Sequence, residues 1–339
     1  MSKKVLLTGG SGFVGSHVVD HLLANTDWHI FVLDRLNYAG SLERLAHHKG
    51  DSRVEWIFHD FRGEFPASVL HRLNGVDFII HNGAESHVDR SISDPEPFVM
   101  SNVVGTMRVL EAAKRLGVAR VLYTSTDEVL GPAPEGIDFC EDSPILPSNP
   151  YSAAKAGGEA LCYAYWKSYM VPVVISRTMN LIGQRQHPEK FVPMCIRRIL
   201  NGEVVTIHGN SQVIGSRKWL HARNQADAIL FLLTRGDEVL GQTYHVVGVE
   251  RTNLEIAELI ANFMGKQLKY ELVDFHAVRL GHDRRYSLCD HRIREMGWQP
   301  PVDFLTSLEQ TVEWTLRPEN LKWLAETPMP KAMAALNAE

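Results

Sequence analysis

Two acidic residues, Asp127 and Glu128, stand side by side where an apolar run of the chain ends. The run, residues 121–123, is typical of a buried strand, so the acids are expected at a strand end, partly out of water. Two close carboxylates repel each other, and partial burial raises the pKa of at least one of them. Such a pair can keep one carboxyl group protonated beside an ionised one, which suits acid–base chemistry. The structural alternative is a pair of turn and cap residues.

A tyrosine and a lysine, Tyr151 and Lys155, lie four residues apart in the string YSAAK, where a helix is predicted. Four residues bring both side chains to one face of that helix. A nearby ammonium group favours the phenolate, so we expect a lowered pKa for Tyr151. The tyrosine could then take a proton from a substrate hydroxyl as hydride leaves the same carbon. The alternative is an amphipathic helix with a surface lysine.

A glycine-rich turn, TGGSGFVG, places Gly9, Gly12 and Gly15 between an apolar strand and a helix. Glycines let the backbone approach a pyrophosphate, and the helix N-terminus favours its negative charge. Asp34 follows at the distance expected for an acid that binds the adenosine ribose, which predicts NAD as the cofactor. Arg35 could instead pair with the 2′-phosphate of NADP. A glycine turn without a ligand is the structural alternative.

The composition describes an ordinary globular chain of 339 residues, 45% hydrophobic and 22% charged. A net charge of −5 predicts no broad basic surface, so nucleic acid is not an expected partner. The apolar runs are too short for a signal peptide or a membrane span, and a cytoplasmic protein is expected. The histidines lack metal-binding spacing, no metal is expected, and residues 46–50 are predicted to form a polar loop. Four cysteines without a CxxC pair predict reduced, buried thiols: Cys140, Cys162, Cys195 and Cys289.

Strands alternate with helices, which predicts an α/β fold: a Rossmann-type, doubly wound parallel sheet covered on both faces. Strands are predicted near residues 3–8, 29–34, 53–60, 76–83, 119–126 and 171–183. Helices are predicted near residues 13–25, 66–75, 97–117, 150–170, 251–265 and 304–317. Ligands of such sheets bind outside the carboxyl ends of the strands, where the two acids fall. We expect an NAD-binding domain over residues 1–180 with later segments returning to it, a smaller α/β lobe over 181–325, and a tail over 326–339.

Longer motifs resemble a known family. TGGSGFVG, YSAAK and RTMNLIG together resemble the extended short-chain dehydrogenase/reductases. HNGAESHVDRSI, STDEVLG, NPYSAAKAGGEAL, PEKFVP and GHDRRYSLCDHRIREMGWQP narrow the resemblance to the dTDP-glucose 4,6-dehydratases, over residues 3–325. The Thr-Asp-Glu string of residues 126–128 is the most specific element, because epimerases and decarboxylases of the superfamily usually carry other residues there.

The resemblance implies a hydro-lyase that uses a tightly held NAD, reduced and reoxidised within one turnover. It assigns Tyr151, helped by Lys155, the removal of the C4 hydroxyl proton while hydride leaves C4. Glu128 would then remove the C5 proton, and protonated Asp127 would release the C6 hydroxyl as water. Hydride would return to C6, and Thr126 would bind the C4 oxygen.

The glycine turn and the resemblance together imply two sets of binding residues. NAD would be held by Gly9, Gly12, Phe13, Val14, Gly15, Asp34, Arg35, Leu36, Asn37, Asp60, Phe61, Asn82, Gly83, Ala84, Glu85, Ser86, Ser101, Tyr151, Lys155 and Leu181. The nucleotide sugar would be held, mainly by the second lobe, at Ser86, Thr126, Asn180, Lys190, Phe191, Thr206, Ile207, His208, Arg217, Asn253, Arg279 and His282. For a single cation, the alternative is an ordinary solvated surface residue.

The substrate half departs from the family pattern. The segment between Gly209 and Trp219 is slightly longer, and the usual Arg-Asp-Trp is Arg-Lys-Trp at residues 217–219. The usual Tyr-Val-Glu-Asp is His-Ala-Arg-Asn at residues 221–224, and Leu130 replaces a tyrosine. Because the longer segment lies where the family grips its nucleotide, UDP-glucose or another activated hexose stays open beside dTDP-glucose.

Two other functions stay open at this point. A 4-epimerase or decarboxylase would need the oxidation by Tyr151 but not both acids, and a non-catalytic NAD-binding module would need neither. Retention of the tyrosine, the lysine and the Thr-Asp-Glu string argues against the module. The superfamily also implies a homodimer through a four-helix interface, here residues 96–116 and 151–169 of each chain.

Overall fold

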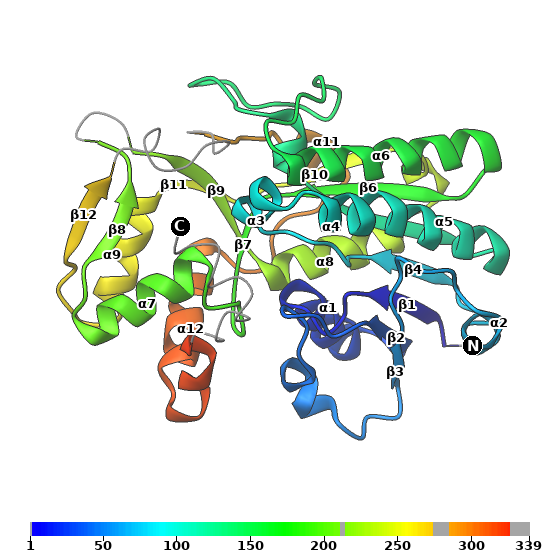
Figure 1. Ribbon diagram of the computed structural model, residues 1–339, viewed down its shortest axis with the longest axis horizontal. Helices are drawn as coiled ribbons and strands as arrows, with labels where there is room; N and C mark the ends of the chain where they lie inside the picture. Colours follow the sequence, from blue (N-terminus) through cyan, green and yellow to red (C-terminus); the bar gives the residue numbers. More distant parts are fainter. Residues whose placement is uncertain (1, 211–213, 274–284, 326–339) are drawn as a thin grey trace.

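The computed structural model describes residues 2–210, 214–273 and 285–325. Within them, the largest element is a parallel sheet with the strand order β3-β2-β1-β4-β5-β6-β10 (Figure 1). Its strands are β1 (Lys4–Thr8), β2 (His29–Asp34), β3 (Val54–Phe58), β4 (Phe78–His81), β5 (Arg120–Thr126), β6 (Val173–Thr178) and β10 (Thr243–Val246). The order of the first six strands is that of the doubly wound dinucleotide-binding fold, which confirms the predicted fold class.

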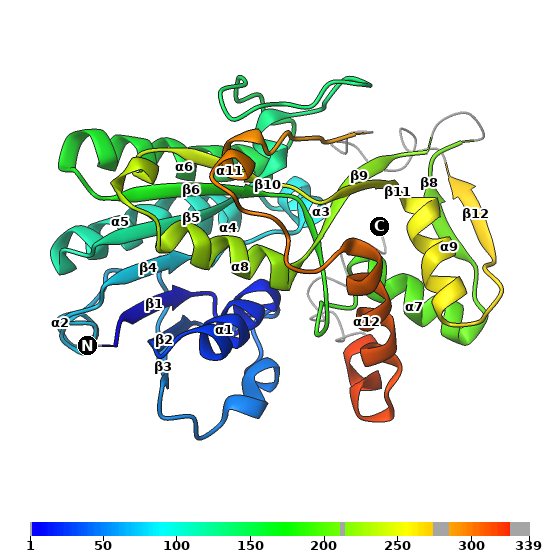
Figure 2. The ribbon, with the colours of Figure 1, turned by 180° about the vertical axis from the view of Figure 1, so that it is seen from behind.

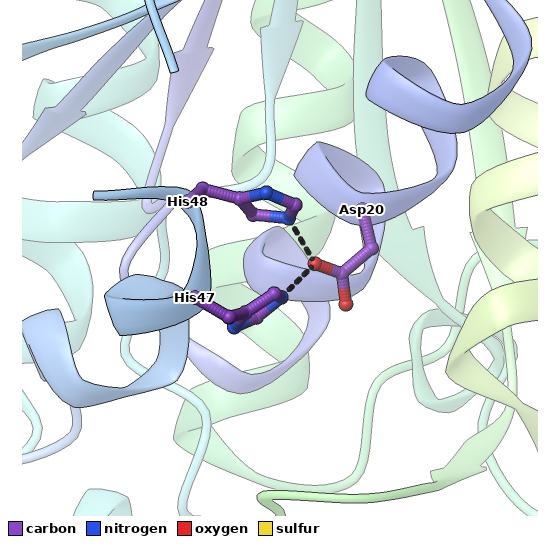
Figure 3. A group of neighbouring side chains, drawn as sticks. All are labelled: Asp20, His47 and His48. Carbon is purple, nitrogen blue, oxygen red and sulfur yellow. Dashed lines mark hydrogen bonds and ion pairs between the residues drawn. The ribbon is translucent and has the colours of Figure 1, made fainter. Parts of the chain in front are cut away.

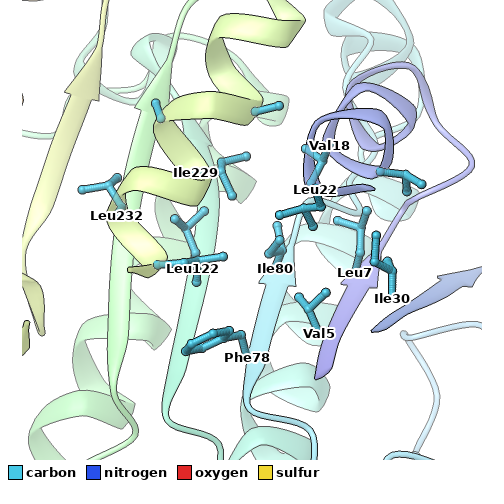
Figure 4. Packing of buried hydrophobic residues seen from close by; sticks show 14 of the residues in the cluster. Val5, Leu7, Val18, Leu22, Ile30, Phe78, Ile80, Leu122, Ile229 and Leu232 are labelled. Atoms are coloured by element: carbon cyan, nitrogen blue, oxygen red, sulfur yellow. The ribbon is translucent and has the colours of Figure 1, made fainter. Parts of the chain in front are cut away.

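Helices cover both faces of this sheet because successive strand residues point to opposite sides. Leu7 packs under α1 and α8, whereas its neighbour Leu6 packs under α2, α5 and α6. Figure 4 shows the first of these layers, with Val18 and Leu22 of α1 beside Ile229 of α8. The helices are α1 (Phe13–Asn25), α2 (Ala67–Arg72), α5 (Gly105–Leu116), α6 (Pro150–Tyr169) and α8 (Ala222–Leu233).

A second lobe lies beside the carboxyl ends of the main sheet (Figures 1 and 2). One of its sheets joins β7 (Asn180–Ile182), β9 (Ser216–His221) and β11 (Val249–Thr252), and the other joins β8 (Val205–His208) and β12 (Tyr270–Val273). The lobe's apolar core is completed by α7 (Phe191–Asn201), α9 (Asn253–Phe263) and α12 (Phe304–Leu316). The chain also returns to the main sheet after residue 180, through α8 and β10.

Short helices complete the described part of the chain. The helix predicted over residues 97–117 is present as α4 (Glu96–Val99), a π-helical turn (Met100–Val104) and α5. The polar loop predicted over residues 46–50 is wrong in part, because Leu42–His48 forms a 3₁₀ helix whose N-cap, Ser41, accepts a hydrogen bond from Glu43 N. The remaining short helices are α3 (Val88–Ser93), Asp127–Leu130, Asp237–Val239, α11 (His291–Glu295) and Pro318–Leu324.

The four cysteines are free thiols, as predicted. Cys162 and Cys195 are buried, but Cys140 is exposed and Cys289 is only half-buried, so the expectation of burial is wrong for Cys140 and met only in part by Cys289. Both lie on irregular segments, where hydrophobic periodicity gives no signal for burial. Among the helices of the described ranges, none is long and apolar enough to cross a membrane.

Candidate active site

A cavity of about 490 Å³ lies between the carboxyl ends of the main-sheet strands and the second lobe. The strands are buried on both faces and end at this edge, and the polar residues that follow them line the cavity. Most of the residues expected from the sequence line the cavity: Gly9, Gly12, Phe13, Val14, Asp34, Arg35, Asn37, Phe61, Asn82, Gly83, Ala84, Ser86, Ser101, Thr126, Asp127, Glu128, Tyr151, Lys155, Asn180, Leu181, Lys190, Phe191, His208, Arg217 and Asn253.

The two acids sit on the short 3₁₀ helix that begins where β5 ends. Thr126 caps this helix, since its Oγ1 accepts a hydrogen bond from Glu128 N, and it donates one to Asp127 Oδ1 over 3.0 Å. Asp127 is 5% exposed, and burial raises its pKa to about 6, although the Thr126 hydrogen bond and the charge of Arg217 oppose the shift. Glu128 is half-buried. The two neighbouring carboxyl groups therefore lie in different environments, which favours different protonation states.

Asn149 connects these acids to helix α6. Its side-chain oxygen accepts a hydrogen bond from Ser152 N and so caps the helix, and its Nδ2 donates to Glu128 Oε2 over 3.1 Å. Pro150 follows at the first helical position, where a missing N–H costs nothing. The sequence Asn-Pro before a helix is an N-cap signal, so this residue could have been found from the sequence.

Tyr151 and Lys155 both face the cavity from α6. Lys155 Nζ donates to the Thr124 carbonyl over 2.6 Å and lies 4.1 Å from the centre of the Tyr123 ring, and burial lowers its pKa to about 8. The lowered pKa predicted for Tyr151 is wrong for this structure. Burial raises the pKa of Tyr151, and the negative charge of Glu128 raises it further.

The glycine turn is shaped for close backbone approach. Gly9 has a φ of 68°, in the left-handed region that favours glycine. A Cβ on Gly15 would lie 2.2 Å from the Gly9 carbonyl oxygen, and one on Gly9 would lie 2.7 Å from Gly83 Cα. Glycines at these positions let β1, α1 and the segment after β4 approach each other and leave the cavity open to a pyrophosphate.

Asp34 and Arg35 bear on the choice between NAD and NADP. Asp34, at the end of β2, accepts hydrogen bonds from Ser11 N and Leu36 N, and burial raises its pKa. Arg35 forms ion pairs with Glu85 and, over 3.4 Å, with Asp60. Because two carboxylates hold the guanidinium, it is not available to a 2′-phosphate, and the expected use of Asp34 on ribose hydroxyls fits.

Several buried hydroxyl groups support a bound ligand in this cavity. Within the described residues, Ser101, Thr124, Ser125 and Thr178 have hydroxyl oxygens without a hydrogen-bond partner, and all four line the cavity. A buried, unpaired hydroxyl costs free energy in the absence of a partner. A polar cofactor or substrate would satisfy these groups, so the residues present fit NAD and a sugar.

Asn102 is a site residue that the sequence analysis missed. It is buried in the π-helical turn, where its side chain accepts from Glu85 N and donates to the Glu85 carbonyl. It therefore fixes the backbone of residues 82–86 beside the cavity. A π turn inside a helix is typical of functional sites, but nothing in the apolar periodicity announces it.

Other expected residues lie off the cavity wall. Gly15 packs against the backbone of Gly9 and Gly10, Leu36 N donates a hydrogen bond to Asp34, and Asp60 and Glu85 hold Arg35. In the lobe, Ile207 is fully buried in the apolar core and Thr206 bonds Glu271, so of these neighbours only His208 lines the cavity. Arg279 and His282, and the tail over residues 326–339, lie outside the described residues.

Further wall residues were not expected from the sequence, since they lie on loops or short helices without a strong local signal: Tyr38, Arg44, His87, Asp89, Gln186, His187, Glu189 and Tyr286. Arg90 stacks over the Tyr38 ring at 3.7 Å and pairs with Glu189 over 3.5 Å. Charged residues from α3 and from the segment before α7 thus meet at the mouth of the cavity.

A second polar cluster joins α1 to the 3₁₀ helix Leu42–His48. His47 Nε2 and His48 Nε2 lie 2.8 Å and 2.7 Å from Asp20 Oδ1 (Figure 3). Arg185 binds the other oxygen of Asp20, and its Nη1 lies 3.5 Å from His47 Nε2. Burial alone would raise the pKa of Asp20, but the guanidinium lowers it below the ordinary value. Because the Arg185 guanidinium already neutralises Asp20 and lies beside His47, we assign the cluster a structural role.

The chain is similar to known proteins over most of its length. Residues 5–248 match the model of the NAD dependent epimerase/dehydratase family. The low-salt glycan biosynthesis protein Agl12 of Haloferax volcanii is 39% identical over 92% of this chain and 98% of its own, and a dTDP-glucose 4,6-dehydratase of an Actinoplanes species is 38% identical over 92% and 97%.

Solved structures of the same kinds of enzyme are also similar to this chain over most of its length. The dTDP-glucose 4,6-dehydratase DesIV of Streptomyces venezuelae, with NAD and TYD bound, has a TM-score of 0.85 and 38% identity, and covers 94% of this chain and 98% of its own. A UDP-glucose 4-epimerase of Thermus thermophilus in complex with NAD has a TM-score of 0.81 and 28% identity, over 91% and 98%. The chain therefore belongs to the NAD-dependent epimerase/dehydratase family.

Proposed function

We propose that this chain is an NAD-dependent nucleotide-hexose 4,6-dehydratase that converts dTDP-glucose to dTDP-4-keto-6-deoxyglucose and water. One observation carries the proposal: Asp127, buried with a raised pKa, lies next to the half-buried Glu128, and both line the cavity with Tyr151. Water elimination needs a second base and an acid besides the tyrosine that removes the C4 hydroxyl proton, whereas a 4-epimerase needs the tyrosine but not these two carboxyl groups. The relatives named dTDP-glucose 4,6-dehydratases support the same substrate.

The side chains of the cavity divide the work as follows. Tyr151 removes the C4 hydroxyl proton, and Thr126 binds the C4 oxygen. The resulting C4 ketone makes the proton on C5 more acidic, and Glu128 removes that proton. Asp127, in its protonated form, gives a proton to the leaving C6 hydroxyl. When bound, NAD⁺ supplies the acceptor for the C4 hydride, which later returns to C6, and a positive charge that favours the Tyr151 phenolate.

The charges of the second lobe suit a nucleoside diphosphate. Lys190 and Arg217 reach the same cavity from the start of α7 and from β9, and Arg217 stacks over Tyr286 at 4.9 Å. Burial lowers the pKa of Lys190, which a diphosphate would counteract by favouring the ammonium form. Asn180 and Asn253 add amides to the same wall.

The test incubates the purified protein, without added cofactor, separately with dTDP-glucose and UDP-glucose. Loss of one water with formation of a 4-keto-6-deoxy sugar, followed by mass spectrometry and NMR, is expected with dTDP-glucose. Unchanged mass with inversion at C4 would instead make the protein an epimerase, and loss of water only from UDP-glucose would correct the nucleotide. The Asp127→Asn and Glu128→Gln variants should bind NAD but should not remove water from the sugar. Normal dehydration by the double variant would refute the roles assigned to the acids.

We also propose a cytoplasmic homodimer in which α5 and α6 of each chain form the interface. The free thiols suit a reducing compartment. The two helices pack side by side on one face of the sheet, and they and the short helices before α5 expose Val99, Met100 and Tyr163. Light scattering should give twice the mass of one chain, and the Tyr163→Glu variant should have a lower measured mass. A single-chain mass for the unchanged protein at micromolar concentration would refute the dimer.

A further inference from the structure

Two cysteines far apart in the sequence meet on the surface of the molecule. Cys140 lies on the segment between the two acids and α6, and Cys289 lies 149 residues later, just before α11. Their Sγ atoms are 2.8 Å apart, and both are free thiols. No step of the proposed reaction uses either of them.

The backbone holds the two residues in register. Phe139 pairs with Leu288 as an isolated parallel bridge, so Cys140 and Cys289 are the residues that directly follow the bridged pair on two neighbouring segments. Phe139 N donates to the Ser287 carbonyl over 3.0 Å, and Cys289 N donates to the Phe139 carbonyl over 2.9 Å. Neighbouring strands lie about 4.8 Å apart, which is within the Cα separation that a disulfide spans.

Charged side chains lock the same two segments together. Arg285 donates to the Pro134 and Ile137 carbonyls and pairs with Asp138, which also accepts from Ser287 and Lys218. The thiols are therefore held in place by contacts that do not depend on them. Linking them requires no movement of the backbone segments past each other.

We propose that Cys140 and Cys289 form a reversible disulfide by exchange with an oxidised low-molecular-weight thiol. Cys140 is the exposed partner, so its thiolate attacks one sulfur of the small disulfide and releases the first small thiol, which takes up the proton lost by Cys140. The Cys289 sulfur then attacks Cys140 in the mixed disulfide and releases the second small thiol, which takes up the proton lost by Cys289. The two cysteines lose two electrons and two protons, and the small disulfide gains them.

The environment of Cys289 sets this order. Burial, and then its contact with Cys140, raise the pKa of Cys289 to about 12, so it is the poorer first nucleophile. The neighbouring His245 has no nitrogen left to bind a metal ion. Its Nδ1 forms a hydrogen bond with the Cys289 carbonyl, and its Nε2 lies 3.3 Å from Arg177 Nη1. Thiol exchange, rather than metal binding, is the chemistry this cluster supports.

The disulfide would tie the segment that ends in Asn149, which contacts Glu128, to the segment that carries Tyr286, a residue of the cavity wall. It would close a long loop in the unfolded chain, so its main effect is on stability. For a chain of this length we expect the unfolding temperature to rise by about 5 °C on oxidation.

The experiment treats the folded full-length protein with oxidised glutathione in the presence of a chelator, blocks remaining thiols with iodoacetamide, and maps the peptides by mass spectrometry. The unchanged chain should lose two hydrogen atoms and give a Cys140–Cys289 linked peptide. Cys162→Ala, which removes a buried thiol, should behave in the same way. Cys289→Ser should stop at a stable glutathione adduct on Cys140.

Thermal unfolding supplies the second measurement. The oxidised chain should unfold at a higher temperature than the reduced one, and dithiothreitol should reverse the shift, while Cys140→Ser should show no shift. Full alkylation of both thiols after the oxidant, or a lasting glutathione adduct on Cys140 of the unchanged chain, would overturn the proposal.

Discussion

The Asn149 side chain donates a hydrogen bond to Glu128 Oε2 and at the same time caps the helix that carries Tyr151. The base assigned to C5 and the base assigned to C4 are thus positioned by one amide. Two groups that act on neighbouring atoms of one sugar need a fixed separation, because misplacement of either raises the barrier. Asn149 provides that fixed separation without touching the reacting atoms itself.

Two substitutions separate the roles of Asn149. Asn149→Ala removes both the cap and the bond to Glu128, and should lower the free energy of unfolding by about 1 kcal/mol. Asn149→Ser keeps a good cap but is too short to reach Glu128. Both should lower kcat for water loss by about 10-fold or more, with little change in KM. If Asn149→Ser dehydrates sugar at the unchanged rate, the positioning role is wrong.

The ionised Asp127 side chain should destabilise the folded protein above pH 6. Its pKa is raised from 3.8 to about 6 in the folded state, so the folded state binds the proton more tightly than the unfolded state does. Stability relative to an uncharged side chain is therefore full below pH 3.8, falls between pH 3.8 and 6, and stays low above that. Asp127→Asn should be more stable than the unchanged chain by about 3 kcal/mol at pH 8. Urea unfolding of both proteins at pH 4 and pH 8 measures their difference in free energy of unfolding. A difference of equal size at the two pH values would contradict the prediction.

The pairing of Arg35 with Glu85 should limit how far NADP can bind. Asp34→Ala removes the acid that disfavours a 2′-phosphate, but Arg35 stays engaged by carboxylates. We expect the single variant to lose NAD affinity and gain little for NADP, and Asp34→Ala with Glu85→Ala to bind NADP measurably. Titration calorimetry on the cofactor-free chain compares the four affinities. Equal NADP binding by the single and double variants would count against this account.

Gly15 should be required for the glycine turn. A Cβ there meets the Gly9 carbonyl oxygen at 2.2 Å, so Gly15→Ala must displace the turn and should abolish NAD binding. Gly63→Ala is the control, because its Cβ meets only the Asp60 carbonyl at 3.4 Å. Absorbance of the NAD that copurifies with each variant gives the result. Unchanged NAD content in Gly15→Ala would show that the turn adapts.

The main sheet was predictable because its strands carry continuous apolar runs that end in polar residues. The seven residues of β5 are buried, and the chemistry follows at once with Asp127. Long-range pairing was not predictable by the same route. Cys140 and Cys289 meet only because two irregular segments pair, and the π-helical turn that buries Asn102 leaves the helical periodicity almost unchanged.

The electrostatics were predictable only in part. The position of the two acids at the end of a buried strand was enough to expect a raised pKa at one of them, and burial gives Asp127 that raised pKa. The effect of Lys155 on Tyr151 was misjudged because helix spacing gives the side of the helix but not the partner of the ammonium group. In the structure that partner is the Thr124 carbonyl, at the end of a neighbouring strand.

The return of the chain to the main sheet through α8 and β10 has an evolutionary consequence. A fragment ending at residue 180 would lose the strand that pairs with β6 and the helix that covers Leu122 and its neighbours. Exposed sheet edges and apolar faces lead to aggregation, so neither part of such a cut would be expected to persist alone. The sugar-facing lobe therefore cannot be exchanged between proteins as a cassette. New substrate preferences on this scaffold would therefore be expected to arise by gradual substitution within the lobe.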